Sequence, residues 1–234
     1  MHHMTREELL KYIRELGISA DQILREEAEM EILDALAKDK ISQRLIFYGG
    51  TALRLAYGCP RFSEDVDLLD LNNALNFSDF KEFAIKIAES REGWRLADLK
   101  NKRKTIFALI NIRDEKIKHA FSIKIEIHKP AGKVSLDYGL RLLKSPVSPA
   151  EPLLLVPELY ELKRLKIDAL GNRKKARDFF DLWFIAQLMR EEFSLPENNP
   201  GFSEREFKNE LKVFLPRKYY AVIDEIYEKI SRKN

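Results

Sequence analysis

The chain has 234 residues, of which 45% are apolar and 34% charged, and its formal net charge is +3. This length is enough for one large domain or two small lobes, and the apolar content supports a folded core. No run of 18 apolar residues is present, which excludes a transmembrane helix, and the one cysteine, Cys59, excludes an internal disulfide.

The first residues, Met1 to Met4, lack the apolar stretch of a signal peptide and look like a cloning remnant with a second start at Met4. Together with the single cysteine, which we expect to be a small packing residue, this favours a cytoplasmic protein. Residues 5–40 have a helical pattern. A first apolar stripe ends at Gly17, and a second helix should begin near Asp21, its expected N-cap.

A short apolar run at residues 44–48 is rich in strand-forming residues, and two glycines, Gly49 and Gly50, follow it. An amphipathic helix should come next, and then a second strand that carries Asp65 and Asp67. Glycines at a strand-to-helix turn let backbone N–H groups approach a phosphate closely. The two aspartates are two residues apart, so they project from the same face of the strand.

Adjacent carboxylates repel each other unless a cation lies between them, and Mg²⁺ takes carboxylate and phosphate oxygens as ligands. The motif therefore predicts a site for Mg²⁺, or Mn²⁺, and a triphosphate; the alternative is a solvated strand end. Just before the aspartates, Arg61 could bind phosphate bidentately, and Ser63 could donate to a phosphate or to Asp65. The alternative for both is a local hydrogen bond in the loop.

Residues 77–90 form a further amphipathic pattern, whose phenylalanines we interpret as core rather than as a base-stacking platform. Three strands should follow at residues 94–99, 105–112 and 121–128. The segment at residues 113–116 is typical of a hairpin connection between the last two.

The last of these strands alternates three isoleucines with Lys124, Glu126 and His128. Glu126 could simply face water. Beside two aspartates on a neighbouring strand it becomes a third metal ligand or a base, since two-metal nucleotidyl transfer needs about three carboxylates. We interpret His128 as a surface residue or one that acts indirectly, because histidine-rich sites suit zinc.

Residues 99–133 contain ten Lys or Arg but three Asp or Glu. Such a local excess suits a polyanionic partner, first of all nucleic acid. The alternative is the solvated surface of a highly charged protein.

Residues 130–152 are rich in proline, and we interpret them as an irregular connection between lobes. Four helices are expected in the rest of the chain, at residues 157–170, 174–190, 203–214 and 217–231. Pro157 should occupy the first turn of the first helix, and Gly171 should end it. Pro196 and Pro200 mark a loop. This organisation predicts N-terminal helices over residues 1–40, a catalytic core over residues 41–150 and a helical lobe over residues 151–234.

Two pairs of charged residues in this lobe could carry chemistry. Lys163 and Lys166 share one face of the first helix, and Asp178 and Asp181 share one face of the next. Because a short turn follows Gly171, the helices should pack antiparallel and bring lysines and aspartates together. The alternative is a salt-bridged helical hairpin without a chemical role.

Four stretches then occur in a familiar order: Gly-Gly-Thr-Ala-Leu-Arg-Leu from Gly49, Arg-Phe-Ser-Glu-Asp-Val-Asp from Arg61, Lys-Ile-Glu-Ile from Lys124, and Lys-Ile-Asp-Ala-Leu from Lys166 ahead of Arg-Asp-Phe-Phe-Asp-Leu. Together they resemble the AbiEii/AbiGii toxin family of nucleotidyltransferases. The resemblance implies a DNA-polymerase-β-like α+β fold, with a mixed sheet, flanking helices and a helical C-terminal lobe that completes the site.

The resemblance also implies roles for individual residues. Gly49, Gly50 and Thr51 match the motif that holds the nucleotide phosphates, and Asp65 and Asp67 match the metal-binding pair. Where relatives can have serine, this chain has Gly50, so a hydroxyl for the phosphate would come from Thr51 or be absent.

Further roles follow for the later motifs. Glu126 matches the third acidic position, which would complete the metal site and accept the proton of the attacking hydroxyl. Lys166 matches the family's lysine and, with Asp178 of the final Asp-x-x-Asp motif, is expected to be catalytic. Nucleotide-binding residues outside the glycine motif are expected to be Arg61, Ser63, Lys163 and Asp181.

The function implied is Mg²⁺-dependent transfer of NMP from an NTP to an acceptor hydroxyl, with release of pyrophosphate. As a type IV toxin, the protein would act on tRNA 3′ ends and would have a cognate antitoxin. Two alternatives stay open: transfer to a protein or small molecule, and a non-catalytic module that binds RNA or protein on the same fold.

Overall fold

A computed structural model describes residues 3–132, 135–173, 175–193 and 201–231. Within these ranges one mixed sheet of seven strands forms, in the order β3-β4-β5-β2-β1-β7-β6. The strands are β1 Leu45–Tyr48, β2 Asp65–Asp70, β3 Trp94–Asn101, β4 Thr105–Ile112, β5 Phe121–His128, β6 Tyr138–Leu142 and β7 Leu153–Pro157. β2 pairs antiparallel with β1 and parallel with β5, and β1 pairs parallel with β7.

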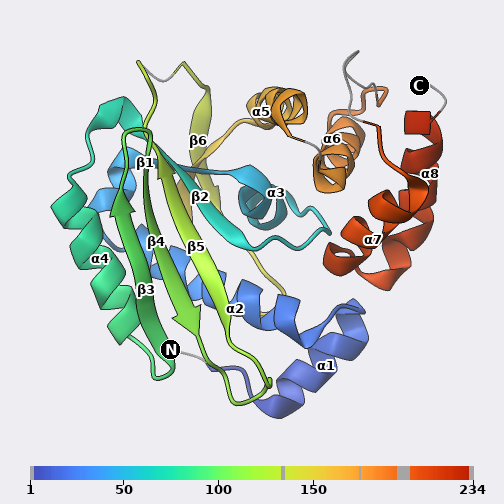
Figure 1. Ribbon diagram of the computed structural model, residues 1–234. Helices are drawn as coiled ribbons and strands as arrows, with labels where there is room; N and C mark the ends of the chain where they lie inside the picture. Colours follow the sequence, from blue (N-terminus) through green and yellow to red (C-terminus); the bar gives the residue numbers. More distant parts are fainter. Residues whose placement is uncertain (1–2, 133–134, 174, 194–200, 232–234) are drawn as a thin grey trace.

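The described part of the chain has eight α-helices, of which α6, α7 and α8 lie together to one side of the sheet (Figure 1). They are α1 Arg6–Leu16, α2 Ala20–Ala37, α3 Gly49–Tyr57, α4 Phe77–Glu89, α5 Leu159–Asn172, α6 Ala176–Met189, α7 Glu204–Phe214 and α8 Tyr220–Ser231. The described ranges also contain three short 3-10 helices, η1 Lys40–Arg44, η2 Leu71–Asn73 and η3 Arg217–Tyr219. The fold is thus the α+β class with a mixed sheet and a helical C-terminal region that the sequence predicted.

One face of the sheet packs against α2 and α4 and forms the main core (Figure 1). The alternation along β5 shows why: Ile123, Ile125 and Ile127 are fully buried on this face, whereas Lys124 and Glu126 are only half-buried on the other. The phenylalanines of α4, Phe80 and Phe83 among them, belong to this core, which confirms that they are not a stacking platform.

A second hydrophobic cluster joins the C-terminal helices to α3. Leu53 of α3 and the neighbouring Cys59 are buried against Phe179 and Phe180 of α6, together with residues of α5, α7 and α8. Cys59 is therefore a packing residue, as predicted, and burial raises the pKa of its thiol to about 12. The helical region is held to the sheet through α3, the element that begins at Gly49.

The N-terminal helices form as the sequence indicated, with one difference in capping. Thr5 caps α1 in a capping box with Glu8, and Gly17 ends the helix at φ 64°. The N-cap of α2 is Ser19, whose side chain accepts from the backbone N–H of Gln22, rather than Asp21. Asp21 lies in the first turn of α2.

The segment predicted to be an irregular connection, residues 130–152, contains the strand β6, and a second unpredicted strand, β7, follows it directly. β6 and β7 pair antiparallel at the edge of the sheet beside β1, so the sheet continues to Pro157, past the boundary that we predicted at residue 150. Tyr138, Leu140 and Leu142 do alternate along β6, but they are exposed and the prolines around them obscured the signal. Pro157 ends β7 and is not in a helix; α5 begins at Leu159.

The remaining helices lie close to their predicted bounds. α5 runs one residue past Gly171, to Asn172, and α6 begins at Ala176. Ser203 caps α7 in a second capping box. The loop predicted around Pro196 and Pro200 lies outside the described residues. None of the helices described has the length and apolar character needed to cross a bilayer.

Glu29 on α2 leads to a prediction about stability. Its side chain is fully buried, and neither carboxylate oxygen has a hydrogen-bond partner in the described ranges. Burial, with the nearby carboxylate of Glu26, raises the pKa of Glu29 well above 4.5. The folded protein therefore holds a proton that the unfolded chain releases, so the stability that this proton confers is complete below about pH 4.5 and is lost as the pH rises towards the folded pKa.

Replacing Glu29 with Gln should remove this dependence. We expect the free energy of unfolding of Glu29→Gln, relative to the unmodified protein, to be higher at pH 8 than at pH 5, as measured by urea unfolding. Glu82→Gln, an exposed substitution on α4, is the control and should show no such change. A difference that is the same at both pH values would contradict the assignment.

Candidate active site

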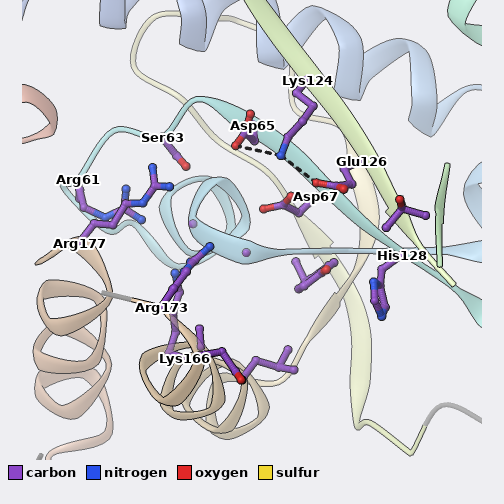
Figure 2. A pocket seen from close by; sticks show the side chains of 17 residues that line it. Arg61, Ser63, Asp65, Asp67, Lys124, Glu126, His128, Lys166, Arg173 and Arg177 are labelled. Atoms are coloured by element: carbon purple, nitrogen blue, oxygen red, sulfur yellow. Dashed lines mark hydrogen bonds and ion pairs between the residues drawn. The ribbon is translucent and has the colours of Figure 1, made fainter. Parts of the chain in front are cut away.

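A pocket of about 400 Å³ lies between the sheet and α5 (Figure 2). It is bounded by the start of α3, the loop before β2, the strands β2 and β5, and the turn between α5 and α6. The sheet face that borders it is the one opposite to the α2–α4 core, and we call it the open face.

The acidic wall of the pocket consists of Asp65, Asp67 and Glu126. The two aspartates flank the buried Val66 on β2, and Glu126 lies opposite Asp67 on the neighbouring strand β5. Paired positions on adjacent strands are about 5 Å apart. The structure thus brings the three predicted carboxylates together on the open face, while their role as metal ligands stays a prediction.

Lys124 lies between these carboxylates. Its Nζ is 2.8 Å from Glu126 Oε2 and 3.6 Å from Asp65 Oδ2, the two contacts that Figure 2 marks with dashed lines. Burial alone would lower the pKa of Lys124, but the hydrogen bond to Glu126 and the carboxylates of Asp65 and Asp67 raise it. The ammonium group therefore stays charged and neutralises part of the acidic wall.

The negative charge that Lys124 does not neutralise affects the pKa of Asp67. Burial, and after it the Asp65 carboxylate, raise the pKa of Asp67 to about 6. As the side chains stand, no three acidic, histidine or cysteine residues of the described ranges converge closely enough to hold a metal ion. Lys124 Nζ occupies the space between the carboxylates of Asp65 and Glu126.

The two positions at the start of α3 require glycine because other side chains lie too close for a Cβ atom. Gly49 has φ 85°, and a Cβ there would lie 2.5 Å from Asp67 Oδ2. A Cβ on Gly50 would overlap with Arg61 Nη2 and lie 2.9 Å from Ser63 Oγ. The glycines therefore let the acidic wall, Arg61 and Ser63 all border the beginning of α3, where backbone N–H groups are free of helical partners.

Thr51 does not present its hydroxyl to the pocket. The residue is buried, and its Oγ1 donates to the backbone carbonyl of Asp65. Thr51 thus ties α3 to the first residue of β2. The hydroxyl that does border the pocket beside Gly50 is that of Ser63.

The basic wall faces the carboxylates across the pocket (Figure 2). It consists of Arg61 from the loop before β2, Lys166 from α5, Arg173 from the turn after α5 and Arg177 from α6. Of these, Arg61 and Lys166 are buried, with 1% and 6% of their surface exposed. A pocket with acidic and basic walls can hold a ligand that carries both cations and anionic oxygens.

A ladder of buried ion pairs fixes the basic wall. Asp181 accepts from Arg61 Nε at 2.6 Å and Nη2 at 2.8 Å, and its Oδ2 is 2.6 Å from Lys166 Nζ. Asp178 accepts from Lys166 Nζ at 3.0 Å and from Arg173 Nε at 2.9 Å. Two aspartates thereby position three cations.

Asp178 and Asp181 are fully buried behind the pocket and do not line it. Although burial opposes it, Lys166 and Arg173 lower the pKa of Asp178 to about 2, and Arg61 and Lys166 likewise lower the pKa of Asp181. Both carboxylates are thus ionised partners of cations. The structure therefore places the two aspartates behind the pocket as partners of the cations that line it, and the catalytic and nucleotide-binding roles predicted for them stay predictions.

Lys163 is also placed differently from the prediction. Lys166 meets the two aspartates of α6, but Lys163 pairs with Glu191 just after α6 and does not line the pocket. Three residues of separation leave the two lysines about 60° apart around the helix and about one turn apart along it, and this is enough for them to reach different neighbours.

Several pocket residues were not assigned from the sequence: Tyr48, Lys124, Arg173 and Arg177. Lys124 had a signal, because it shares the alternation of Glu126. Tyr48 lies opposite Asp67 on β1, and burial raises its pKa. Arg173 lies in the turn after α5 and Arg177 in the first turn of α6. The spacing of residues in a turn does not indicate where their side chains point. His128 is exposed at the rim, in line with the surface role expected for it.

Arg54 of α3 holds the loop that carries Arg61. It forms an ion pair with Glu26 of α2, and its Nη1 donates to the carbonyls of Cys59 at 3.1 Å and Pro60 at 3.0 Å. Its guanidinium also lies 3.5 Å from the centre of the Phe62 ring. The loop is therefore fixed from both sides, by Arg54 and by Asp181.

The mixed sheet, with its paired aspartates opposite a basic wall, is the fold and site of a chain that a family model identifies as a nucleotidyltransferase. A family model described as "Nucleotidyl transferase AbiEii toxin, Type IV TA system" matches residues 31–210, most of the chain. The chain therefore belongs to the AbiEii family of nucleotidyltransferase toxins of type IV toxin–antitoxin systems. This confirms the resemblance that the four motifs carried. It does not support the alternative of a non-catalytic module.

Two crystal structures of Helicobacter pylori proteins are similar in fold. One is JHP933, with a TM-score of 0.54 and 18% identity over 92% of this chain and 96% of the other. The second is of a "putative nucleotidyltransferase", with a TM-score of 0.55 and 18% identity over 93% of this chain and 99% of the other. At this identity the likeness supports the fold and not the substrate. No curated protein matches the chain.

The ion-pair ladder predicts a large effect of Asp181. Asp181→Asn removes the charge that two buried cations share, and breaking a buried ion pair in this way costs about 3–5 kcal/mol. We expect a loss of that size in the free energy of unfolding, measured with urea. Lys163→Met breaks a half-exposed pair and should cost less than about 1 kcal/mol. Similar losses in the two variants would contradict the proposed dependence on Asp181.

Proposed function

We propose that the pocket binds an NTP as its Mg²⁺ complex and that the protein transfers the NMP unit to an acceptor hydroxyl. The observation that carries this proposal is the pair of facing walls. A nucleoside triphosphate with its metal has cations for the acidic wall and phosphate oxygens for the basic wall. A cleft lined by charges of only one sign would match either the metal or the phosphates of such a ligand, but not both.

The donors present fit a hard divalent cation. Asp65, Asp67 and Glu126 offer carboxylate oxygens on one face, and Lys124 already places a positive charge among them. Oxygen ligands of this kind suit Mg²⁺, or Mn²⁺, rather than zinc. When bound, the metal would neutralise charge on the triphosphate.

The residues of the chain would then act mainly through position and charge. Backbone N–H groups at the start of α3 face the phosphates, and Lys166, Arg61 and Arg173 stabilise the charge that develops on the leaving pyrophosphate. The acceptor oxygen forms a bond to the α-phosphorus while the bond from that phosphorus to the pyrophosphate oxygen breaks. Glu126 accepts the proton of the acceptor hydroxyl.

We further propose RNA, with the 3′ end of tRNA as the favoured class, as the acceptor. The basic stretch at residues 99–133 supports a polyanionic acceptor, and a protein or small molecule is the alternative that the experiment below separates. Membership of a type IV toxin–antitoxin family leads us to expect an antitoxin partner. A protein that uses NTPs and tRNA would act in the cytoplasm.

Transfer can be tested directly with labelled nucleotides. Each NTP, labelled on the α-phosphate, is incubated with total RNA or with lysate protein in the presence of Mg²⁺. We expect label in RNA with at least one NTP, and no label when the γ-phosphate carries it. Asp65→Asn and Asp67→Asn should abolish transfer, whereas Lys163→Met should retain it. Undiminished transfer by both aspartate variants would refute the mechanism, and label in protein would correct the acceptor.

Lys124 gives a prediction for metal affinity. Since its ammonium group pairs with two of the carboxylates that would hold the metal, Lys124→Met should bind Mn²⁺ more tightly than the unmodified protein in the absence of nucleotide. The expected gain is up to about fivefold, because a half-exposed ion pair contributes up to ~1 kcal/mol. Electron paramagnetic resonance of free Mn²⁺ measures it, with Lys124→Arg as the control that keeps the charge. Weaker binding by Lys124→Met would contradict this arrangement.

A further inference from the structure

The end of β3 and the turn that leads to β4 form a compact basic surface, which we call the basic turn. Four of the five residues from Lys100 to Lys104 are Lys or Arg, and all five are exposed. Lys129, just after β5, donates through Nζ to Asn101 Oδ1 at 2.5 Å and to the carbonyl of Lys102 at 3.0 Å. The turn is thus held to the end of the strand that carries Glu126.

An aromatic ring lies between this turn and the active site. On the open face, Phe107 of β4 is paired with Lys100 of β3 on one side and with Glu126 of β5 on the other. Glu126 is paired in turn with Asp67. With about 5 Å between strands, the ring of Phe107 is one strand away from the carboxylate expected to receive the acceptor's proton.

The ring is flanked by positive charge. The Nζ atoms of Lys100 and Lys102 lie 5.5 and 5.1 Å from its centre. Lys100 also pairs with Asp98. Unlike Phe80 of the α4 core, which is fully buried, Phe107 is half-exposed on the open face.

We propose that the open face around Phe107 binds the single-stranded 3′ end of an RNA acceptor. The terminal base stacks on Phe107, and the phosphates before it contact the basic turn, chiefly Lys102, Arg103 and Lys104. This inference rests on the nucleotidyl transfer proposed above and specifies how its acceptor is held. A stacking ring beside cations matches unpaired bases joined by phosphates, whereas a peptide acceptor offers no base to stack.

The register explains why such a base would deliver a hydroxyl to the pocket. The sugar of a stacked nucleotide, with its 3′ hydroxyl, lies to one side of the base, and Glu126 is one strand, about 5 Å, from Phe107. A base on Phe107 can therefore place its 3′ hydroxyl beside Glu126. The ring sets the position of the end of the chain and is indifferent to most of its sequence, because every base has a face that stacks.

Binding of RNA tests the stacking part of the proposal. Fluorescence anisotropy is measured with a 5′-labelled single-stranded RNA and with the same strand in a blunt duplex, whose terminal base is already stacked. Phe107→Ala should weaken single-strand binding about 5- to 150-fold, and Phe107→Trp should retain it. Leu109→Ala, the next substitution along the same face of β4, is the control and should change little.

The salt dependence of RNA binding tests the proposed phosphate contacts with a variant in which Phe107 is unchanged. Single-strand binding falls with salt by a slope of about 0.7 for each phosphate contacted. Replacing Lys102, Arg103 and Lys104 together by Ala should therefore lower the slope of log affinity against log salt by about two. These three residues are exposed, so the triple variant is expected to fold.

NTP binding, measured by calorimetry on the same variants, separates this proposal from the proposed function. We expect Phe107→Ala to bind NTP as the unmodified protein does. Unchanged RNA affinity in Phe107→Ala, or an unchanged salt slope in the triple variant, would overturn the proposed binding of RNA at Phe107 and the basic turn. Transfer of label to protein without RNA binding would also overturn it, while leaving nucleotidyl transfer intact.

If Phe107→Ala loses RNA binding but the unmodified protein binds no NTP, the RNA site is supported and the proposed function is refuted.

Discussion

The pairing of Asp181 with Arg61 and Lys166 is the interaction on which the site depends. One carboxylate on α6 fixes a guanidinium from the loop before β2 and an ammonium from α5, which joins three segments that are far apart in the sequence. The desolvation of these charges is costly and is offset only while all partners are present. The ladder is therefore better understood as a device for position than as a source of stability. It holds two cations of the basic wall opposite the carboxylates of the sheet.

The sheet supplies the acidic wall of the pocket, because successive residues of a strand alternate between its two faces. Apolar residues of β2 and β5 face the α2–α4 core, so Asp65, Asp67 and Glu126 must face the open side. Because α2 also carries Glu26, which binds Arg54, the same helix that buries the sheet fixes the loop bearing Arg61. Core packing and the geometry of the pocket are consequently not independent: a shift of α2 would move both the acidic wall and the loop.

The sequence predicted the orientation of side chains correctly where it follows from the period of a strand or helix. It did not predict the partners of side chains where these depend on tertiary contacts. The face shared by the three carboxylates follows from a period of two, and the helices of the C-terminal region follow from their apolar stripes. Lys163 and Lys166 both satisfy a helical spacing, but their different partners depend on where α6 ends. The exposed edge strand β6 had a weak pattern among prolines, and Arg173 gained its place from Asp178, which no spacing rule relates to it.

The central claim is that the two walls together bind a nucleoside triphosphate with its metal. Calorimetric titration with each NTP, with Mg²⁺ and then with excess chelator, tests it most directly. We expect that at least one NTP binds with Mg²⁺, that chelation weakens binding strongly, and that Lys166→Met weakens it in either condition. Binding that depends on neither the metal nor Lys166, or no binding of any NTP, would contradict a role of the two walls in nucleotide binding.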